Sequence, residues 1–141
     1  MNFMYRHHVV PTSLAHDVMK MLRMQEFRPT VLGESAPQVW TPTTQSQKLT
    51  LTSLWDSTLP SVSVFHYTSH SSLPSTTFPM RWGNMVAMVL LGNTLHFSVP
   101  AMQTTLRIPN RSVLLLEDMC PHATSVPQGE CYAIMFYKEQ V

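Results

Sequence analysis

The sequence predicts an α+β fold, in which a jelly-roll core of antiparallel strands carries one N-terminal helix packed on one sheet. Short segments with strand character fill the second half of the chain, turn residues separate them, and one amphipathic segment lies near the N-terminus. Short strands at this spacing are typical of sandwiches and barrels. The 141 residues fit one domain, with a helix and extended segments in residues 1–60 and the jelly-roll core in residues 61–137.

The predicted helix covers residues 13–27. Thr12 or Ser13 can cap its N-terminus, and Pro29 prevents it from running further. The face that we expect to pack on a sheet follows helical spacing through Leu14, Val18, Met21, Leu22 and Gln25.

Strands are weaker features in the first 60 residues. The alternation in Lys48-Leu49-Thr50-Leu51-Thr52 predicts a strand there. Three shorter candidates are Val9-Val10, Val31-Leu32 and Val39-Trp40.

The second half is more regular. Strands are predicted at residues 61–67, 85–91, 94–99, 104–108, 112–117 and 131–137, with a loop at residues 68–79. Gly92-Asn93 is expected to form a hairpin turn between the second and third of these strands. Pro109-Asn110-Arg111 is expected to form a turn before the fifth.

Composition predicts a folded cytoplasmic protein without a membrane segment. Hydrophobic residues make up 44% of the chain and charged residues 12%, which argues against disorder. The net charge of +1 shows no basic excess of the kind that marks nucleic-acid binding, although a local patch would suffice. The longest apolar run, Met85–Leu91, is too short to span a bilayer. Cys120 and Cys131 are interpreted as reduced thiols, because two cysteines are too few for a disulfide framework.

A series of motifs in the second half resembles one protein family. The motifs are Val64-Phe65-His66-Tyr67, Ser72-Leu73-Pro74, Gly92-Asn93-Thr94-Leu95-His96-Phe97, the segment Ile108-Pro109-Asn110-Arg111-Ser112 with the three leucines after Val113, Pro121-His122-Ala123-Thr124-Ser125-Val126 and Cys131-Tyr132-Ala133-Ile134-Met135-Phe136. In this order they resemble the AlkB-like domain of Fe(II)/2-oxoglutarate dioxygenases, including the versions in replication polyproteins of some plant RNA viruses. The resemblance implies a double-stranded β-helix (jelly-roll) core.

The resemblance also implies where an active site would lie. That family holds iron through two histidines and one carboxylate, with positions left open for 2-oxoglutarate and oxygen. Its pattern places Thr76 and Phe78 at two ligand positions and His122 at the third. Cys131 and Tyr137 stand where arginines would grip 2-oxoglutarate. One ligand of three remains, so we expect no cofactor, and Fe(II) and 2-oxoglutarate only if the ligands lie elsewhere.

Histidines and acids offer alternative metal sites. His122 is either a ligand at the barrel mouth or a surface or half-buried histidine in a loop. His66 and His70, with His122 and His96, could form a rearranged metal site, the alternative being scattered structural histidines. Glu117-Asp118 could add a carboxylate or simply end a strand in solvent.

Two further patterns point to other functions. Cys120 and His122 would share one face of a strand, and this pair, or Cys131 with His122, could act as nucleophile and base of a thiol hydrolase. Arginine with aromatic side chains is the usual composition of a surface for single-stranded nucleic acid, the alternative being plain surface charge. The residues of this candidate RNA-facing patch are Arg81, Trp82, Phe97, Arg107 and Arg111.

Three functional hypotheses result. The leading one is a divergent, non-catalytic AlkB-like domain of a viral replication protein in the cytoplasm of an infected host cell. It would act as an RNA-associated or protein-interaction module, with RNA or replication-complex proteins as partners. The second is an active Fe(II)/2-oxoglutarate-dependent nucleic-acid demethylase. The third is a jelly-roll structural protein unrelated to oxygenases.

Overall fold

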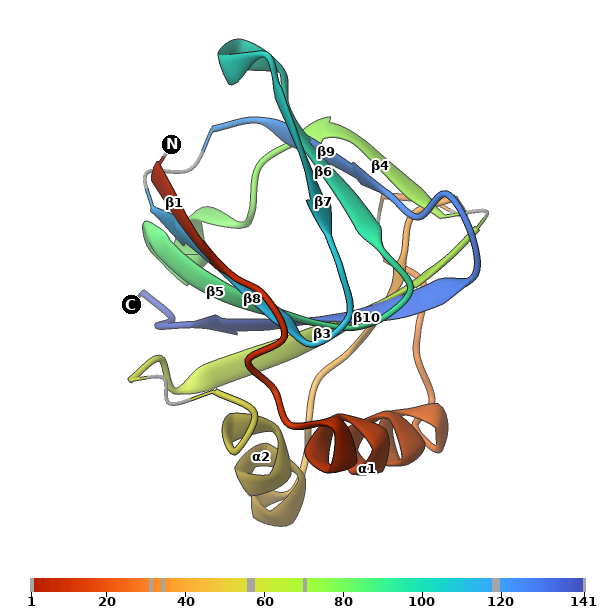
Figure 1. The fold of residues 1–141 in the computed structure, drawn as a ribbon. Helices are drawn as coiled ribbons and strands as arrows, with labels where there is room; N and C mark the ends of the chain where they lie inside the picture. The colour runs from red at the N-terminus through yellow and green to blue at the C-terminus, as the bar shows by residue number, and fades with distance from the viewer. Residues whose placement is uncertain are drawn as a thin grey trace.

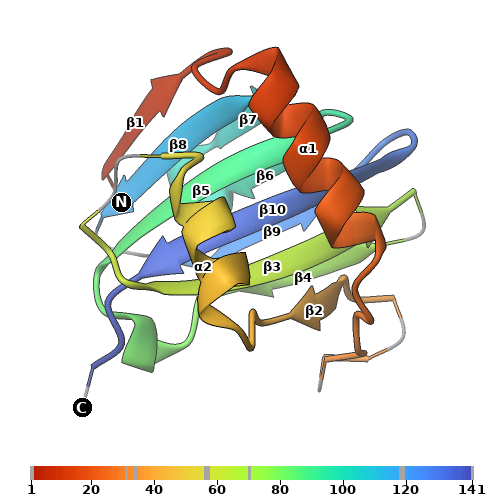
Figure 2. The same ribbon diagram turned by 90° about the horizontal axis from the view of Figure 1, so that it is seen from below.

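Two antiparallel β-sheets face each other, and the helices α1 (Thr12–Arg23) and α2 (Gln45–Thr52) lie on the outer side of the larger sheet (Figures 1 and 2). This computed structural model describes residues 2–30, 32–33, 35–55, 58–69, 71–117 and 120–140. The three layers are therefore helices, large sheet and small sheet. The predicted α+β jelly-roll fold is confirmed.

Strand order follows from a chain that crosses repeatedly between the sheets. The large sheet has the order β1-β8-β5-β10-β3-β2 and the small sheet the order β4-β9-β6-β7. From β3 onward, every connection crosses between the sheets except the β6–β7 hairpin. The strands are β1 (Asn2–Arg6), β2 (Gln38–Trp40), β3 (Ser61–Thr68), β4 (Ser72–Thr76), β5 (Met85–Gly92), β6 (Leu95–Val99), β7 (Thr104–Ile108), β8 (Ser112–Glu117), β9 (His122–Ser125) and β10 (Glu130–Tyr137). Short 3-10 helices cover Met80–Trp82 (η1) and Pro100–Met102 (η2).

The large sheet is buried on both faces, as β10 shows. Its odd-numbered residues face the small sheet and join the core between the sheets, whereas its even-numbered residues join a second core beneath the helices. This division follows from the alternation of side chains along a strand. Cys131, Ala133, Met135 and Tyr137 lie in the first core, and Tyr132, Ile134 and Phe136 lie in the second.

Helix α1 covers the sheet as predicted but has different ends. Pro11 occupies its N-cap position without a side-chain hydrogen bond. The Thr12 hydroxyl is instead engaged by Arg111, whose Nη1 donates to Thr12 Oγ1 at 2.9 Å. The helix ends at Arg23, and Gln25 Nε2 donates to the Met21 carbonyl at 3.0 Å. Of the predicted face, Val18 and Leu22 are buried, and Leu14, Met21 and Gln25 are half-buried. Ala15, which the prediction did not include, is buried as well.

The segment Lys48–Thr52 is helical, so the strand predicted there is wrong. It belongs to α2, which begins with a capping box. Gln47 N donates to Thr44 Oγ1 at 3.2 Å, and Thr44 N donates to Gln47 Oε1 at 3.2 Å. These two bonds pair backbone N–H groups at the start of the helix, which have no partner within the helix itself. Leu51 then packs beneath the helix, while Leu49 lies on the exposed face.

Other strand predictions need correction as well. Val9-Val10 lies between β1 and α1 and is not a strand. The loop predicted at residues 68–79 contains β4. Gly92-Asn93 does not join a hairpin, because β5 pairs with β8 and β10 and the chain passes from there into the small sheet. Val39-Trp40 is confirmed as part of β2, whereas Val31 of the Val31-Leu32 candidate lies outside the described residues.

Gly92 is required where β5 leaves the large sheet, and its replacement should be costly. Its φ is +111°, and an added Cβ would lie 2.7 Å from the Glu130 carbonyl oxygen and 2.9 Å from the Cys131 Cα. Gly33 has the same φ of +111° but nothing within 4 Å of such a Cβ. Gly92→Ala should therefore lower the free energy of unfolding by about 3 kcal/mol, and Gly33→Ala by about 1 kcal/mol. Equal losses in urea denaturation would contradict this explanation.

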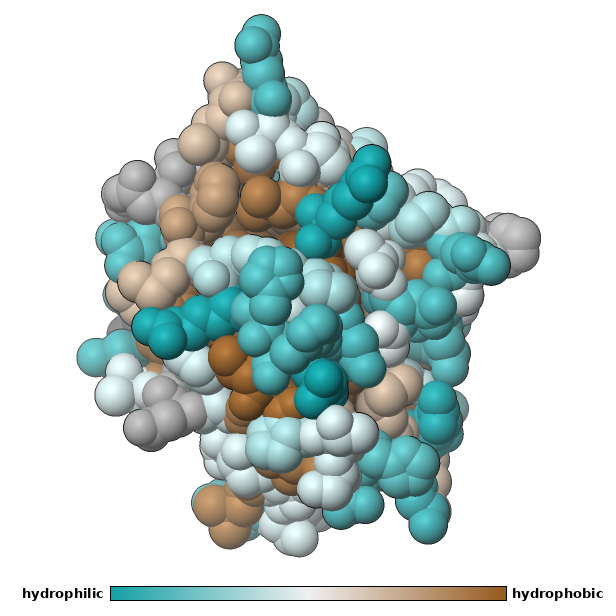
Figure 3. Space-filling model, viewed as in Figure 1, coloured by the Kyte–Doolittle hydropathy of each residue, from teal (hydrophilic) through white to brown (hydrophobic). Residues whose placement is uncertain are grey.

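The surface is mixed in character. On the face drawn in Figure 3, apolar side chains gather between β1 and the β6–β7 hairpin, with hydrophilic side chains around them. A hollow of about 160 Å³ beside β1 is lined by Phe3, Met4, Leu115 and Glu117. Neither α1 nor α2, nor any other helix in the described part of the chain, is long and apolar enough to cross a membrane.

Candidate functional site

A cavity of about 560 Å³ opens between the two sheets. Strands β2, β3, β4, β9 and β10 supply part of its wall, and η1 with the three residues before it supplies another part. Thr30, Leu32 and Thr41 complete the lining. The lining residues are Thr30, Leu32, Val39, Thr41, Ser63, Phe65, Tyr67, Leu73, Thr76, Thr77, Phe78, Pro79, Met80, Arg81, Trp82, His122 and Met135.

His122 lies in the wall of this cavity and is 1% exposed. It begins β9, so the prediction of a surface or half-buried loop histidine is wrong. Its ring stacks on Phe97 at a centroid distance of 4.7 Å and lies 4.5 Å from the ring of Phe78. Burial between two apolar rings is possible because a neutral imidazole needs few polar partners.

The protonation of His122 follows from its contacts. Its Nδ1 lies 3.2 Å from the Cys120 carbonyl oxygen. A carbonyl only accepts, so Nδ1 carries the proton and Nε2 is left as an acceptor. Burial lowers the pKa of His122 below its usual 6.5, and the bond to the carbonyl opposes this shift. The Cys120 contact is made by the backbone, so it lends no support to a nucleophilic Cys120–His122 pair.

The structure brings together the three positions that the family pattern associates with metal binding. Thr76 is the Cα partner of His122 across the β4–β9 pair, and Phe78 contacts the His122 ring. These positions hold a hydroxyl, a phenyl and one imidazole. Among the described residues, no group of three or more His, Cys, Asp or Glu side chains could hold a metal ion. The residues present therefore do not fit an iron centre of two histidines and one carboxylate.

The two positions at which arginines would bind 2-oxoglutarate hold uncharged residue types instead. Cys131 and Tyr137 lie on the inner face of β10, where both are buried. Burial raises the pKa of the Cys131 thiol to about 12, so it is neutral. Tyr137 stacks on Trp82 at 4.3 Å, and its hydroxyl lies 2.9 Å from Ser63 Oγ. Neither residue offers a cation, and Lys138 is exposed beyond the strand.

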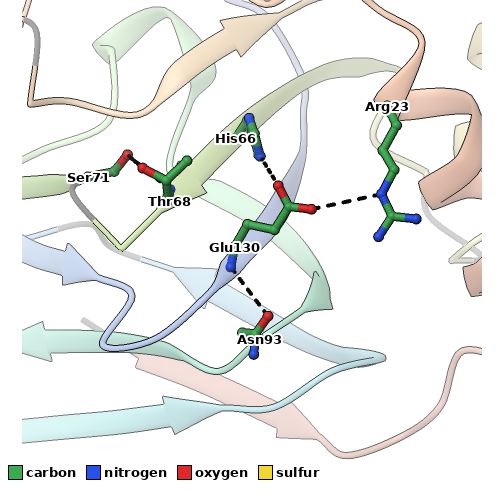
Figure 4. A network of polar contacts seen from close by, with 6 residues as sticks. All are labelled: Arg23, His66, Thr68, Ser71, Asn93 and Glu130. Atoms are coloured by element: carbon green, nitrogen blue, oxygen red, sulfur yellow. Dashed lines mark hydrogen bonds and ion pairs between the residues drawn. The ribbon is translucent and has the colours of Figure 1, made fainter.

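The other candidate metal ligands lie elsewhere. His66 faces the helices, where it stacks on Tyr132 at 4.6 Å and its Nε2 lies 2.8 Å from Glu130 Oε2 (Figure 4). Arg23 approaches the same carboxylate at 3.8 Å. His96 lies between the inward-facing Leu95 and Phe97, so it points to the outer side of the small sheet.

Of the remaining acidic and histidine candidates, the structure describes Glu117 alone. Glu117 is exposed at the end of β8. His70 and Asp118 lie outside the described residues. Cys120 and Cys131 are both free thiols.

The candidate RNA-facing patch divides into separate parts. Trp82 and Phe97 are buried in the core between the sheets, so the expectation that they belong to a surface patch is wrong. Arg81 lies at the cavity rim and approaches Glu139 at 3.6 Å. Arg111 is held by the Val10 carbonyl and Thr12, and Arg107 is exposed on β7. An RNA contact through these arginines stays a prediction.

Sequence reasoning did not select several lining residues of the cavity. Ser63, Phe65 and Tyr67 all face inward from β3, and their odd-numbered spacing was the available signal. The Tyr67 hydroxyl lies 2.8 Å from Thr124 Oγ1, and burial raises its pKa. Met80 and Met135 were missed because they belong to different segments that meet only in the folded chain.

Known proteins resemble this chain in structure but not in sequence. No protein-family profile and no curated protein matches the sequence. The viral collagen prolyl hydroxylase of Paramecium bursaria Chlorella virus-1, in its 2OG complex, matches in structure with a TM-score of 0.72 and 9% identity, over 100% of this chain and 97% of its own. A Pseudomonas putida prolyl-4-hydroxylase matches with 0.68 and 10% identity, over 98% and 92% of the two chains.

A third structure extends the comparison. The non-heme alpha ketoglutarate dependent epimerase SnoN from nogalamycin biosynthesis matches with a TM-score of 0.58 and 10% identity, over 96% of this chain and 80% of its own. Identities of 9–10% show the fold and leave the activity to be argued from the site residues. The chain therefore has the jelly-roll fold found in 2-oxoglutarate-dependent oxygenases.

Proposed function

We propose that this domain is a non-catalytic binding module that keeps the oxygenase fold without the oxygenase reaction. The observation that carries the proposal is the environment of His122. Thr76 and Phe78 flank it at the positions where two further ligands are expected. A threonine hydroxyl and a phenyl ring do not replace an imidazole and a carboxylate on Fe(II).

The charge of the cavity supports the same conclusion. Among the described residues that line it, Arg81 is the one side chain with a permanent charge, and it lies at the rim beside Glu139. Cys131 and Tyr137 lie in the core between the sheets, where burial raises the pKa of the Cys131 thiol and the Tyr137 hydroxyl is paired with Ser63. A dicarboxylate such as 2-oxoglutarate would lose its hydration there without gaining a guanidinium partner.

The narrower form of the proposal concerns the biological setting. The order of motifs from Val64 to Phe136 supports an AlkB-like origin, and with it an RNA-associated or protein-interaction role in a viral replication protein. Binding of single-stranded RNA with an affinity that falls steeply with salt would support the RNA form. Assembly into a symmetric particle would favour a jelly-roll structural protein instead.

Titration of the protein with Fe(II) and 2-oxoglutarate tests the central claim. Under anaerobic conditions, calorimetry should detect no saturable binding up to about 1 mM of either compound, which means less than about 4 kcal/mol of binding free energy. In air, no succinate should form with a methylated oligonucleotide. His122→Ala should leave both results unchanged. Saturable binding together with succinate release coupled to demethylation would contradict the proposal and establish the demethylase alternative.

A further inference from the structure

The cavity beside His122 is already open and large enough for an organic molecule. Its volume is about 560 Å³, whereas an apolar cavity of about 150 Å³ is known to accept benzene. Ligand pockets generally fall between about 300 and 1,000 Å³. The strands β2, β3, β4, β9 and β10 supply part of the wall, and the segment of residues 77–82 with Thr30, Leu32 and Thr41 supplies the rest.

Aromatic rings form a continuous part of the wall. Trp82 stacks between Phe78, at 5.3 Å, and Tyr137, at 4.3 Å. Phe65 lies 6.1 Å from Trp82 and also lines the cavity. Leu73 and Met135 complete the apolar surface. A flat aromatic guest would find ring edges and faces of the kind that aromatic pairs prefer.

Most polar groups in the wall are already paired within the protein. The Tyr67 hydroxyl pairs with Thr124 and the Ser63 hydroxyl with Tyr137. His122 uses Nδ1 for the Cys120 carbonyl. An apolar guest would therefore leave these groups satisfied, whereas a charged guest would meet no buried counterion in the described wall.

The Trp82 indole contributes its ring, and not its N–H, to the cavity wall. The N–H is inaccessible to solvent and makes no hydrogen bond within the described part of the chain. A guest in the open cavity cannot reach a group that water does not reach, so no acceptor on the guest is called for.

The mouth of the cavity is apolar as well. Met80 is 94% exposed and Leu32 is 58% exposed, and both line the opening. Large apolar side chains left in solvent beside a concave site are typical of ligand entrances. Arg81 at the same rim approaches Glu139, which offsets its charge.

We propose that this cavity binds a small uncharged aromatic molecule of one or two rings. The inference rests on the proposed function, because it assigns a ligand class to a pocket that has no place for iron and 2-oxoglutarate. The ligand would pack against the rings of Phe65 and Phe78, which line the cavity and are only half-buried.

The neutral fluorophore prodan, which carries a naphthalene ring system, is a direct probe. It should bind the whole chain saturably, with blue-shifted emission and a dissociation constant in the range of about 1 to 100 µM. The charged 2-naphthoate should bind at least about tenfold more weakly than prodan, since it loses its hydration in the cavity.

Two exposed methionines distinguish binding in the cavity from nonspecific binding to apolar side chains on the surface. Met80 lines the opening, whereas Met24 is 81% exposed at the end of α1. Met80→Ala should weaken prodan binding about threefold and Met24→Ala should leave it unchanged, both without loss of folding because the side chains are exposed. Equal effects of the two variants, tighter binding of 2-naphthoate, or no saturable binding would overturn the inference. Iron binding in the earlier titration would instead contradict the proposed function.

Discussion

Replacing Thr76 by His and Phe78 by Asp should create a divalent metal site with His122. The wild-type protein lacks two of the three ligands, although its backbone already places the three positions together. Thr76 pairs with His122 across the β4–β9 ladder, and the Phe78 ring lies 4.5 Å from the imidazole. Two imidazoles and one carboxylate on these positions form the ligand set that suits Fe(II), Co(II) and Zn(II).

The expected change in metal affinity is large. The double variant should bind Co(II) with a dissociation constant of about 1 µM or tighter, which corresponds to about 8 kcal/mol, whereas the wild type should show no saturable binding. Without metal the variant should be less stable than the wild type by about 3 to 5 kcal/mol, because Phe78 leaves a stacked core and a carboxylate takes its place. Co(II) at about one hundred times its dissociation constant should then restore roughly 2.7 kcal/mol.

Calorimetry, the visible absorption of Co(II) and urea denaturation with and without EDTA measure these changes. Adding His122→Ala to the double variant is the matched control, and it should abolish the metal site. Binding that survives this control would mean that the metal is held elsewhere. A folded double variant that binds no Co(II) would show that residues 76, 78 and 122 do not converge as their packing indicates.

Local pattern predicted the long strands well and the short ones poorly. The strands with dense apolar content, such as β5 and β8, were located almost to the residue because their side chains alternate or are buried on both faces. Strand β4 was missed because Ser72–Thr76 contains Pro74, which an edge strand tolerates since it has one partner. Helix α2 was misassigned although Thr44 and Gln47 already carried the capping-box signal.

The candidate site could be predicted only in part for a physical reason. His122, Thr76 and Phe78 were identified from their order along the chain, and the fold does place them around one cavity. Local sequence carries no information on which distant ring will cover a given side chain. The stacking of Phe97 on His122 and of Tyr137 on Trp82 depends on how the two sheets pack. Motifs and residue spacing therefore could not predict that His122 and Trp82 are buried.

The turn at Gly92 illustrates the same limit. A Gly-Asn pair between two strands fits a hairpin and also fits a connection that crosses between sheets. Here β5 continues into the small sheet, and its neighbours in the large sheet are β8 and β10. Sheet assignment is a long-range property, since it depends on which strands can bury each apolar face.

Acidification from pH 7.5 to pH 5 should weaken the fold through His122. Burial lowers the pKa of this imidazole in the folded protein, whereas in the unfolded chain it has its usual value of about 6.5. The unfolded state therefore binds more protons than the folded state once the pH falls below about 6.5. Stability from this group is fully present above that pH and is lost as the pH falls toward the folded pKa, by at most about 1.4 kcal/mol per pH unit.

Urea denaturation at half-unit steps between pH 7.5 and pH 5 measures this loss. His122→Phe keeps a ring between Phe78 and Phe97, and His122→Gln keeps an amide donor for the Cys120 carbonyl. Both variants should have a lower free energy of unfolding than the wild type at neutral pH. Between pH 7.5 and pH 5, however, their free energy of unfolding should fall by up to about 2 kcal/mol less than that of the wild type. His16→Gln, on the exposed face of α1, should keep the wild-type slope. An unchanged slope in both His122 variants would mean that solvent or a compensating group reaches the imidazole, and that the cavity is more polar than its walls indicate.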